Sequence, residues 1–451
     1  MTRYTGFSHL LASQAAARPH APAILYEKAG AKSLMTRREL LFAAQKRAAE
    51  LCGKRAIFVL CDGSLENVVT VFGAVLAGVR VILADAGAQE DALCALLEYT
   101  RADCLYCEDE ELAEILTAHL DPGAPGGAGE LLFFTSGTTD RNKAVVLTDA
   151  SLCASAWNGS ALLPLQPEDT LMCMLPLCHV FGFVCSLLWP LVCGAAVALG
   201  RGPRHYGDDC AFFEPTALSA VPLLAGFLIK HRCLNPALRL VLIGAGDCPP
   251  QLISALEAQG IFVSFGYGLT ETSSGVALSL GEDKYAMTVC PEADITLAQD
   301  GEILIKAPTC MMQGYWQRPE DTAAAVTEGT LHTGDLGRWD EKGLLHITGR
   351  KKEMLVLSDG TKLFLPEYEP PIRAALGTEE AAVIVRDGAP VLVIKDCGRT
   401  KAEILAALGP LMARESRARQ IKDVITVAEN LPRTATGKIQ RWAIQQKVSA
   451  L

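Results

Sequence analysis

The sequence predicts an α/β protein built mainly from parallel sheets covered by helices. Short apolar runs of strand length alternate with longer segments of helical periodicity, a pattern typical of parallel strands joined by helical crossovers. Near residues 295–305 the pattern changes to short alternating strands. With 451 residues, half of them hydrophobic, the chain is long enough for two or more domains.

The strand and helix signals recur in the same order along the first part of the chain. The apolar run Ala56–Leu60 predicts a buried strand, Leu65–Leu76 predicts a helix, and Val79–Leu83 predicts the next strand. This order is repeated by the strand candidate Leu238–Ile243, the helix candidate Gln251–Gln259, which Gly260 closes as a C-cap, and the strand candidate Ile261–Ser264.

A change of character marks the end of a large first domain. The segment Gln299-Asp300-Gly301 is typical of a hairpin turn between short strands. After Gly349 the chain continues with the charged stretch Arg350–Glu353, which contains neither Gly nor Pro. We therefore predict a large N-terminal domain over residues 1–349 and a small C-terminal domain over residues 350–451.

The composition excludes several classes of function. A net charge of −10 and a pI near 5.4 argue against a nucleic-acid-binding protein. The 16 cysteines are scattered through apolar stretches, and the pair Cys104 and Cys107 has no second pair at zinc-finger spacing, which predicts core packing rather than a metal site. No uninterrupted apolar run approaches the ~20 residues of a membrane-spanning helix, and the N-terminus lacks the apolar core of a secretion signal. We expect a soluble cytoplasmic protein with no membrane span.

The segment Leu131–Val145 is the most informative one for function. An apolar, strand-like run leads into a loop rich in Ser, Thr and Gly that ends in a lysine. Small residues let backbone N–H groups approach an anion, hydroxyls add donors, and the lysine adds a positive charge, so the predicted ligand is a polyphosphate. The loop lacks the Gly-x-x-x-x-Gly-Lys-Ser/Thr pattern of nucleotide hydrolases. Its candidate binding residues are Thr135, Ser136, Gly137, Thr138, Thr139 and Lys143.

Four further segments have the character of a nucleotide site. In Gly266–Thr272, Tyr267 offers a flat face to a purine, and Glu271 is a hard oxygen ligand suited to Mg²⁺. In the turn Thr333-Gly334-Asp335, the carboxylate can accept both hydroxyls of a ribose. The other two segments are Thr348–Lys352 and the small-residue loop Pro432–Lys438.

Together and in this order, the five segments resemble the adenylate-forming (AMP-binding) superfamily of acyl-CoA synthetases, adenylation domains and luciferases. The similarity covers nearly the whole chain, and its longest stretch is Gly314–Leu355. The segment Gly349–Glu367 is most similar to fatty-acyl-activating members. The resemblance implies the adenylate-forming enzyme fold, in which a large α/β domain with a small β-barrel-like part is followed by a small mobile α+β domain that rotates about a hinge at Lys352.

The resemblance also implies the reaction and a role for each site residue. The reaction is ATP-dependent activation of a carboxylic acid to an acyl-adenylate with release of pyrophosphate, followed by thioester formation with CoA. Lys438 bridges the carboxylate, the α-phosphate and the ribose, and His179 swings between the two half-reactions. The implied nucleotide contacts are the loop from Thr135 to Lys143 for the β- and γ-phosphates, Gly244, Ala245, Gly246 and Tyr267 for adenine, Thr270 for phosphate, Glu271 for Mg²⁺, and Asp335 and Arg350 for the ribose.

The residues that follow His179 bear on the acid. In amino-acid-activating relatives the next residue is an aspartate that pairs with the α-ammonium group, whereas Val180 offers no counter-charge to a buried ammonium. The flanking side chains are apolar. We expect a fatty acid to lie in a pocket lined by His179, Val180, Phe181, Phe183 and Gly268.

Three alternatives remain beside this reading. The acyl group could pass to the phosphopantetheine of an acyl carrier protein, the acid could be an aryl acid, or the chain could be a catalytically weak binding protein. The phosphate loop departs from the superfamily's Thr-Gly-x-Pro-Lys-Gly pattern at Asp140, Asn142 and Ala144, which predicts a working but slower loop.

Overall fold

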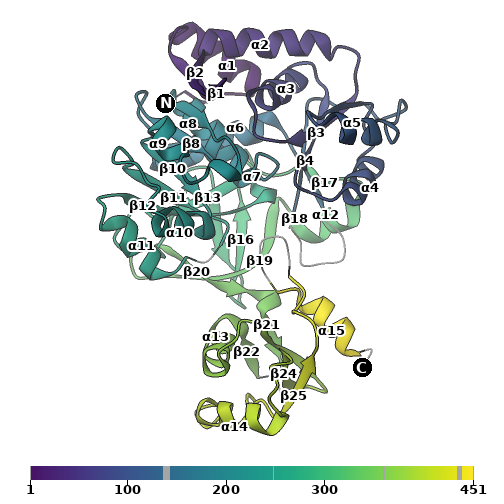
Figure 1. Ribbon diagram of the computed structural model, residues 1–451, viewed down its shortest axis with the longest axis vertical. Coiled ribbons are helices and arrows are strands. Elements are labelled where there is room, and N and C mark those ends of the chain that lie inside the picture. Colours follow the sequence, from purple (N-terminus) through teal and green to yellow (C-terminus); the bar gives the residue numbers. More distant parts are fainter. Residues whose placement is uncertain (1, 136–142, 247, 359–360, 434–438, 450–451) are drawn as a thin grey trace.

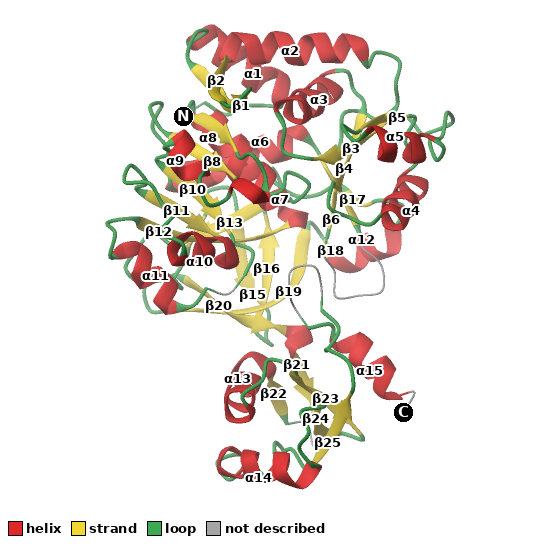
Figure 2. Cartoon of the chain, in the orientation of Figure 1, coloured by secondary structure: helices red, strands yellow, loops and turns green. Residues whose placement is uncertain are grey.

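Two parts of unequal size make up the computed structural model, which describes residues 2–135, 143–246, 248–358, 361–433 and 439–449. The larger part contains three sheets with helices around them, and the smaller part lies beyond the third sheet (Figure 1). Figure 2 shows helices on the outside of the two upper sheets, as the alternation of strand and helix signals predicts.

The largest sheet has nine strands in the order β14-β13-β12-β11-β10-β8-β9-β1-β2. The strands from β12 to β1 run parallel, and antiparallel pairs close both ends of the sheet. The prediction of a mostly parallel sheet is therefore confirmed. The strands are β1 (Pro22–Lys28), β2 (Ala31–Thr36), β8 (Thr170–Cys173), β9 (Ala196–Leu199), β10 (Ala217–Ala220), β11 (Leu240–Ile243), β12 (Phe262–Leu269), β13 (Ser274–Leu278) and β14 (Thr288–Val289).

The second sheet has six strands in the order β17-β7-β6-β4-β3-β5. Its strands β6, β4, β3 and β5 are parallel, while β7 and β17 extend the sheet in the antiparallel sense. The two strands predicted around residues 56–60 and 79–83 are β3 and β4, which lie side by side in its interior. The strands are β3 (Ala56–Cys61), β4 (Arg80–Asp85), β5 (Cys104–Tyr106), β6 (Leu131–Phe134), β7 (Ala144–Leu147) and β17 (Gly314–Tyr315).

Capped helices connect the strands of the large part. The predicted helix Leu65–Leu76 is α3 with the same bounds, because the Ser64 side chain caps its N-terminus by accepting from the Asn67 amide. The other helices of this part are α1 (Phe7–Ala17), α2 (Arg37–Glu50), α4 (Glu90–Thr100), α5 (Glu110–Thr117), α6 (Asp149–Leu162), α7 (Val180–Gly182), the π-helix η1 (Phe183–Leu188), α8 (Trp189–Cys193), α9 (Asp209–Phe213), α10 (Pro222–Lys230), α11 (Pro250–Glu257) and α12 (Pro319–Ala325), with short 3₁₀ turns η2 (Pro203–His205) and η3 (Thr270–Thr272).

The third sheet is antiparallel and confirms the predicted change to short strands. It runs β15-β16-β19-β18, and β20 pairs with the other end of the long strand β19. Gly301, with φ of +87°, lies in the predicted hairpin turn between β15 and β16. The strands are β15 (Asp294–Leu297), β16 (Glu302–Lys306), β18 (Val326–Thr327), β19 (Thr330–Trp339) and β20 (Leu345–Arg350).

The smaller part begins after β20 and has its own core. The buried side chains of the described residues fall into clusters drawn from residues 4–345 and clusters drawn from residues 363–448. This separation supports a domain boundary between residues 345 and 363, and the predicted boundary between residues 349 and 350 stays a proposal. The elements are η4 (Lys351–Glu353), β21 (Met354–Val356), β22 (Lys362–Phe364), α13 (Leu365–Leu376), β23 (Ala381–Arg386), β24 (Ala389–Lys395), α14 (Lys401–Met412), β25 (Asp423–Val427) and α15 (Arg441–Ser449).

Two expectations from composition can be compared with this fold. The cysteines are free thiols, most of them buried or half-buried, as core packing predicts. Within the described ranges, no helix has both the length and the apolar character needed to cross a membrane.

Candidate functional site

A buried carboxylate joins three of the predicted nucleotide segments. Asp335 is 2% exposed and accepts a hydrogen bond from the Tyr267 hydroxyl at 2.9 Å. The Arg350 guanidinium pairs with its other oxygen at 2.8 Å, because β19 and β20 place the two residues opposite each other. Burial, followed by the charge of Asp335, raises the pKa of Tyr267, so the phenol stays protonated and donates. The structure therefore brings the predicted purine and ribose residues together.

The turn before Asp335 is braced from the neighbouring strand. The Thr333 hydroxyl donates to the Ile303 carbonyl at 2.7 Å and accepts from the Asp335 amide at 3.0 Å. The Gly334 amide donates to the Glu302 carboxylate at 2.8 Å, and Gly334 has φ of +70°, which favours glycine. These contacts hold the Asp335 carboxylate in place before any ligand binds.

The predicted phosphate lysine and the predicted metal carboxylate meet around one tyrosine. The Lys143 ammonium lies 4.5 Å from the centroid of the Tyr315 ring, and the Tyr315 hydroxyl donates to Glu271 at 2.7 Å. Lys143 also forms an ion pair with Asp321 at 3.0 Å. Glu271 lies with Thr270 in the 3₁₀ turn η3, directly after β12. Sequence reasoning missed Tyr315 and Asp321, although both lie in the Gly314–Leu355 stretch that carries the resemblance.

The start of the phosphate loop lies next to its lysine. The Thr135 amide donates to the Lys143 carbonyl at 3.0 Å, which closes the two ends of the loop. The predicted phosphate ligands Ser136, Gly137, Thr138 and Thr139, and the departures Asp140 and Asn142, lie outside the described residues.

Glycine is required at two positions of the predicted site for different steric reasons. A Cβ on Gly268 would lie 1.8 Å from the Ser274 carbonyl oxygen, so close packing of β13 requires glycine there. A Cβ on Gly244 would lie 2.7 Å from the Phe181 ring. The absence of a side chain at Gly268 thus allows β12 and β13 to pair, whereas its absence at Gly244 avoids a clash with the Phe181 ring. Ala245, between Gly244 and Gly246, has φ of +63° in the turn after β11.

The predicted acid-binding segment divides between the site and the core. The His179 ring is exposed at the surface beside Asp85 and Cys178. A ring nitrogen of His179, the sulfur of Cys178 and a carboxylate oxygen of Asp85 all lie within 4.8 Å of one another. Desolvation by the surrounding protein lowers the pKa of His179, although the negative charge of Asp85 raises it. The ring is therefore neutral at pH 7. Val180 is 8% exposed.

Phe183 lies in the core rather than in an acyl pocket. Its side chain is 0% exposed. Its ring packs edge-on against Phe133 at a centroid distance of 5.5 Å and is tilted against Phe7 at 6.1 Å. An apolar side chain suits a core and a pocket equally, so only the neighbours distinguish them. Of the two phenylalanines that were predicted to line the pocket, Phe181 is the one that faces Gly244.

Comparison with known proteins identifies the family. Residues 130–316 match the family model described as AMP-binding enzyme. The chain is 30% identical to a 3-[(3aS,4S,7aS)-7a-methyl-1,5-dioxo-octahydro-1H-inden-4-yl]propanoyl:CoA ligase of Mycobacterium tuberculosis, over 72% of this chain and 67% of that protein. The chain belongs to the AMP-binding, adenylate-forming acyl-CoA ligase superfamily. It is therefore an AMP-forming acid–thiol ligase, which ligates an acid to CoA with ATP through an acyl-adenylate.

Other relatives extend the similarity over the whole ligase. A 2-succinylbenzoate–CoA ligase of Bacillus velezensis is 27% identical over 97% of both chains. A long-chain-fatty-acid–CoA ligase of Mycobacterium tuberculosis is 27% identical over 89% of this chain and 82% of that protein. Among solved structures, the O-succinylbenzoate coenzyme A synthetase of Bacillus subtilis, in complex with ATP and magnesium, matches with a TM-score of 0.78 at 22% identity, over 97% of this chain and 99% of that one. The predicted adenylate-forming fold is confirmed.

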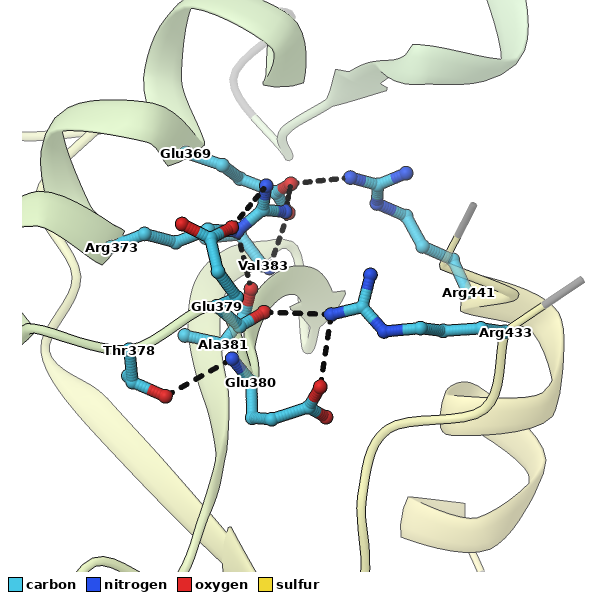
Figure 3. Close-up of polar contacts among 9 residues, drawn as sticks. All are labelled: Glu369, Arg373, Thr378, Glu379, Glu380, Ala381, Val383, Arg433 and Arg441. Atoms are coloured by element: carbon cyan, nitrogen blue, oxygen red, sulfur yellow. Dashed lines mark hydrogen bonds and ion pairs between the residues drawn. The ribbon is translucent and has the colours of Figure 1, made fainter. Parts of the chain in front are cut away.

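The ligase holds the two flanks of its predicted catalytic lysine with arginines (Figure 3). Lys438 itself lies outside the described residues. Before it, Arg433 donates to the Glu379 carbonyl at 2.8 Å and to the Glu380 carboxylate at 3.1 Å. After it, Arg441 donates to Glu369, which is 3% exposed. Residues 433 and 441 are therefore both tied to one stretch of the smaller part, residues 369–380.

The junction between the two parts of the ligase is braced by the lysine before the predicted hinge. The Lys351 ammonium lies 2.6 Å from both Asp300 and Glu302 of the third sheet. Hydrogen bonds to these carboxylates raise the pKa of Lys351. The backbone of Lys352 lies in the turn η4, and its role as a hinge stays a prediction.

Proposed function

We propose that this ligase activates a carboxylic acid with an apolar acyl group and no α-ammonium group, and transfers it to CoA. The observation that carries the proposal is Val180, a buried apolar side chain where amino-acid-activating members place an aspartate. An ammonium group beside it would lose hydration without gaining a counter-charge. Phe181, packed on Gly244, adds an aromatic wall.

Within this class a medium- or long-chain fatty acid is the first candidate and an aryl acid is the second. The apolar Val180 and Phe181 that follow His179 support the fatty acid, and a long-chain-fatty-acid–CoA ligase is among the relatives. The aryl acid is supported by the similarity to 2-succinylbenzoate–CoA ligases.

The buried carboxylate of Asp335 is suited to bind the nucleotide that this reaction uses. Asp335 and Arg350 would receive the ribose of ATP, with Tyr267 beside the adenine and the backbone of Gly244, Ala245 and Gly246 forming the rest of that pocket. Lys143 would bind the phosphates, and Thr270 and Glu271 would meet a phosphate and Mg²⁺. Glu271 offers the oxygen donor that Mg²⁺ prefers. Lys438 would neutralise the charge that develops when the carboxylate meets the α-phosphate.

Pyrophosphate release tests the choice of acid. The purified protein is assayed with ATP, Mg²⁺ and, in turn, acetate, octanoate, palmitate, benzoate and the amino acids. We expect release with octanoate, palmitate or benzoate. A preference for acetate or for an amino acid would contradict the proposal. Productive acids are then supplied with CoA and, separately, with an acyl carrier protein, and we expect the thioester to form with CoA.

A further inference from the structure

The segment Gly314–Asp321 binds two groups that the proposed function assigns to ATP and Mg²⁺. Asp321 pairs with the Lys143 ammonium at 3.0 Å, and the Tyr315 ring lies under the same ammonium at 4.5 Å. The Tyr315 hydroxyl occupies one oxygen of Glu271. Both nucleotide-site groups therefore have protein partners in this structure.

Backbone pairing holds this segment against the phosphate loop. Tyr315 of β17 pairs with Val145 of β7, two residues after Lys143. The Trp316 amide donates to the Ala144 carbonyl at 2.8 Å, and the Tyr315 amide donates to the Thr322 hydroxyl at 2.9 Å. Asp321, in the first turn of α12, is thereby kept within reach of the lysine.

The ion pair between Lys143 and Asp321 is charged at neutral pH and partly exposed to solvent. The hydrogen bond from Lys143 lowers the pKa of Asp321, so the carboxylate is ionised at neutral pH. The two side chains are 26% and 40% exposed, so solvent screens the pair. Arg318 lies 3.2 Å from the second oxygen of Asp321 and remains a partner for it when Lys143 leaves. A triphosphate carries several negative charges that can form charge-assisted hydrogen bonds with an ammonium group, whereas Asp321 carries one.

We propose that Asp321 is a resident counter-ion of Lys143 that competes with the phosphates of ATP for this lysine. The proposal rests on the proposed function, in which Lys143 binds phosphate. Removing the carboxylate frees the ammonium before the nucleotide arrives, so MgATP should bind more tightly. Pyrophosphate, which presents the same phosphate groups to Lys143, should also be retained longer.

Calorimetric titration of the full-length protein with MgATP tests this competition. We expect Asp321→Asn to tighten MgATP binding by about fivefold, which corresponds to about 1 kcal/mol, the upper range for an exposed ion pair. The control is Glu320→Gln. It removes the same charge from the same first turn of α12, and Glu320 is exposed. The control should bind MgATP as the unmodified protein does.

Lys143→Ala and the double variant separate this proposal from the function on which it rests. Lys143→Ala should weaken MgATP binding, and adding Asp321→Asn to it should change nothing further, because the carboxylate acts only through the lysine. If Lys143→Ala leaves binding unchanged, the phosphate role of Lys143 fails. If Lys143→Ala weakens binding but Asp321→Asn matches Glu320→Gln, or still tightens binding without Lys143, the counter-ion proposal alone is overturned.

Discussion

Arg441→Met should loosen the segment that carries the predicted catalytic lysine. In Figure 3 the buried carboxylate of Glu369 receives Arg441, Arg373 at 2.6 Å and the Val383 amide at 2.7 Å. Methionine keeps part of the apolar stem and removes the charge. A hydrogen bond to a charged group contributes about 1.5–3 kcal/mol, and we expect the lower end, about 1.5 kcal/mol, because Glu369 keeps two donors.

Arg433→Met is the matched variant on the other side of the lysine. Its ion pair with Glu380 is more exposed, at 32% and 24%, so its loss should cost less than ~1 kcal/mol. Comparing the two variants separates a general effect of removing an arginine charge from the specific effect of leaving a buried carboxylate with fewer partners.

Thermal unfolding and ATP–pyrophosphate exchange measure the two consequences. We expect Arg441→Met to lower the unfolding temperature and to slow exchange about tenfold, the equivalent of about 1.4 kcal/mol. The affinity for MgATP should be unchanged, because the contacts lie in the smaller part. Arg441→Lys should restore part of the rate. If Arg441→Met and Arg433→Met behave alike in both assays, the reasoning from burial is refuted.

Four further outcomes follow from the site. Tyr267→Phe keeps the flat ring but removes the hydroxyl that donates to Asp335. Losing a hydrogen bond to a charged group costs about 1.5 kcal/mol, so the MgATP dissociation constant should rise roughly tenfold. The control Tyr206→Phe, which loses a hydrogen bond to the Met174 carbonyl, should leave this constant unchanged. Lys438→Ala should slow pyrophosphate exchange by ~10²–10³ with MgATP affinity retained, and exchange at the unmodified rate would remove Lys438 from the mechanism. Val180→Asp should abolish the gain in kcat/KM along a series of fatty acids, in which each buried CH₂ contributes about 0.8 kcal/mol; a gain that persists would place the acyl chain elsewhere. Burial raises the pKa of Glu302, but hydrogen bonds from Lys351 and Gly334 outweigh burial and hold this pKa below its ordinary value. The ionised carboxylate therefore contributes its full stability at a pH above the ordinary pKa, and this contribution is lost as the pH falls through the lowered pKa. Lys351→Met should flatten the resulting fall in unfolding temperature at acid pH.

Local signals were sufficient for the elements that the sequence predicts best. Helix α3 has its predicted bounds because apolar periodicity and the Ser64 cap act within a few residues of each other. The strands β3 and β4 follow from buried apolar runs, and the hairpin at Gly301 follows from its turn residues. The order of the nucleotide segments was likewise enough to indicate the superfamily.

The partners of the site residues were decided only by the tertiary structure. Strand β17 pairs with β7 from a distant part of the chain and thereby places Tyr315 and Asp321 beside Lys143. Phe183 is a core residue because its neighbours are Phe7 and Phe133, which no local pattern around it reveals. The sequence by itself determined which side chains could bind a nucleotide, since that depends on their chemistry. Which charge each of them meets depends on long-range packing, and only the fold specifies it.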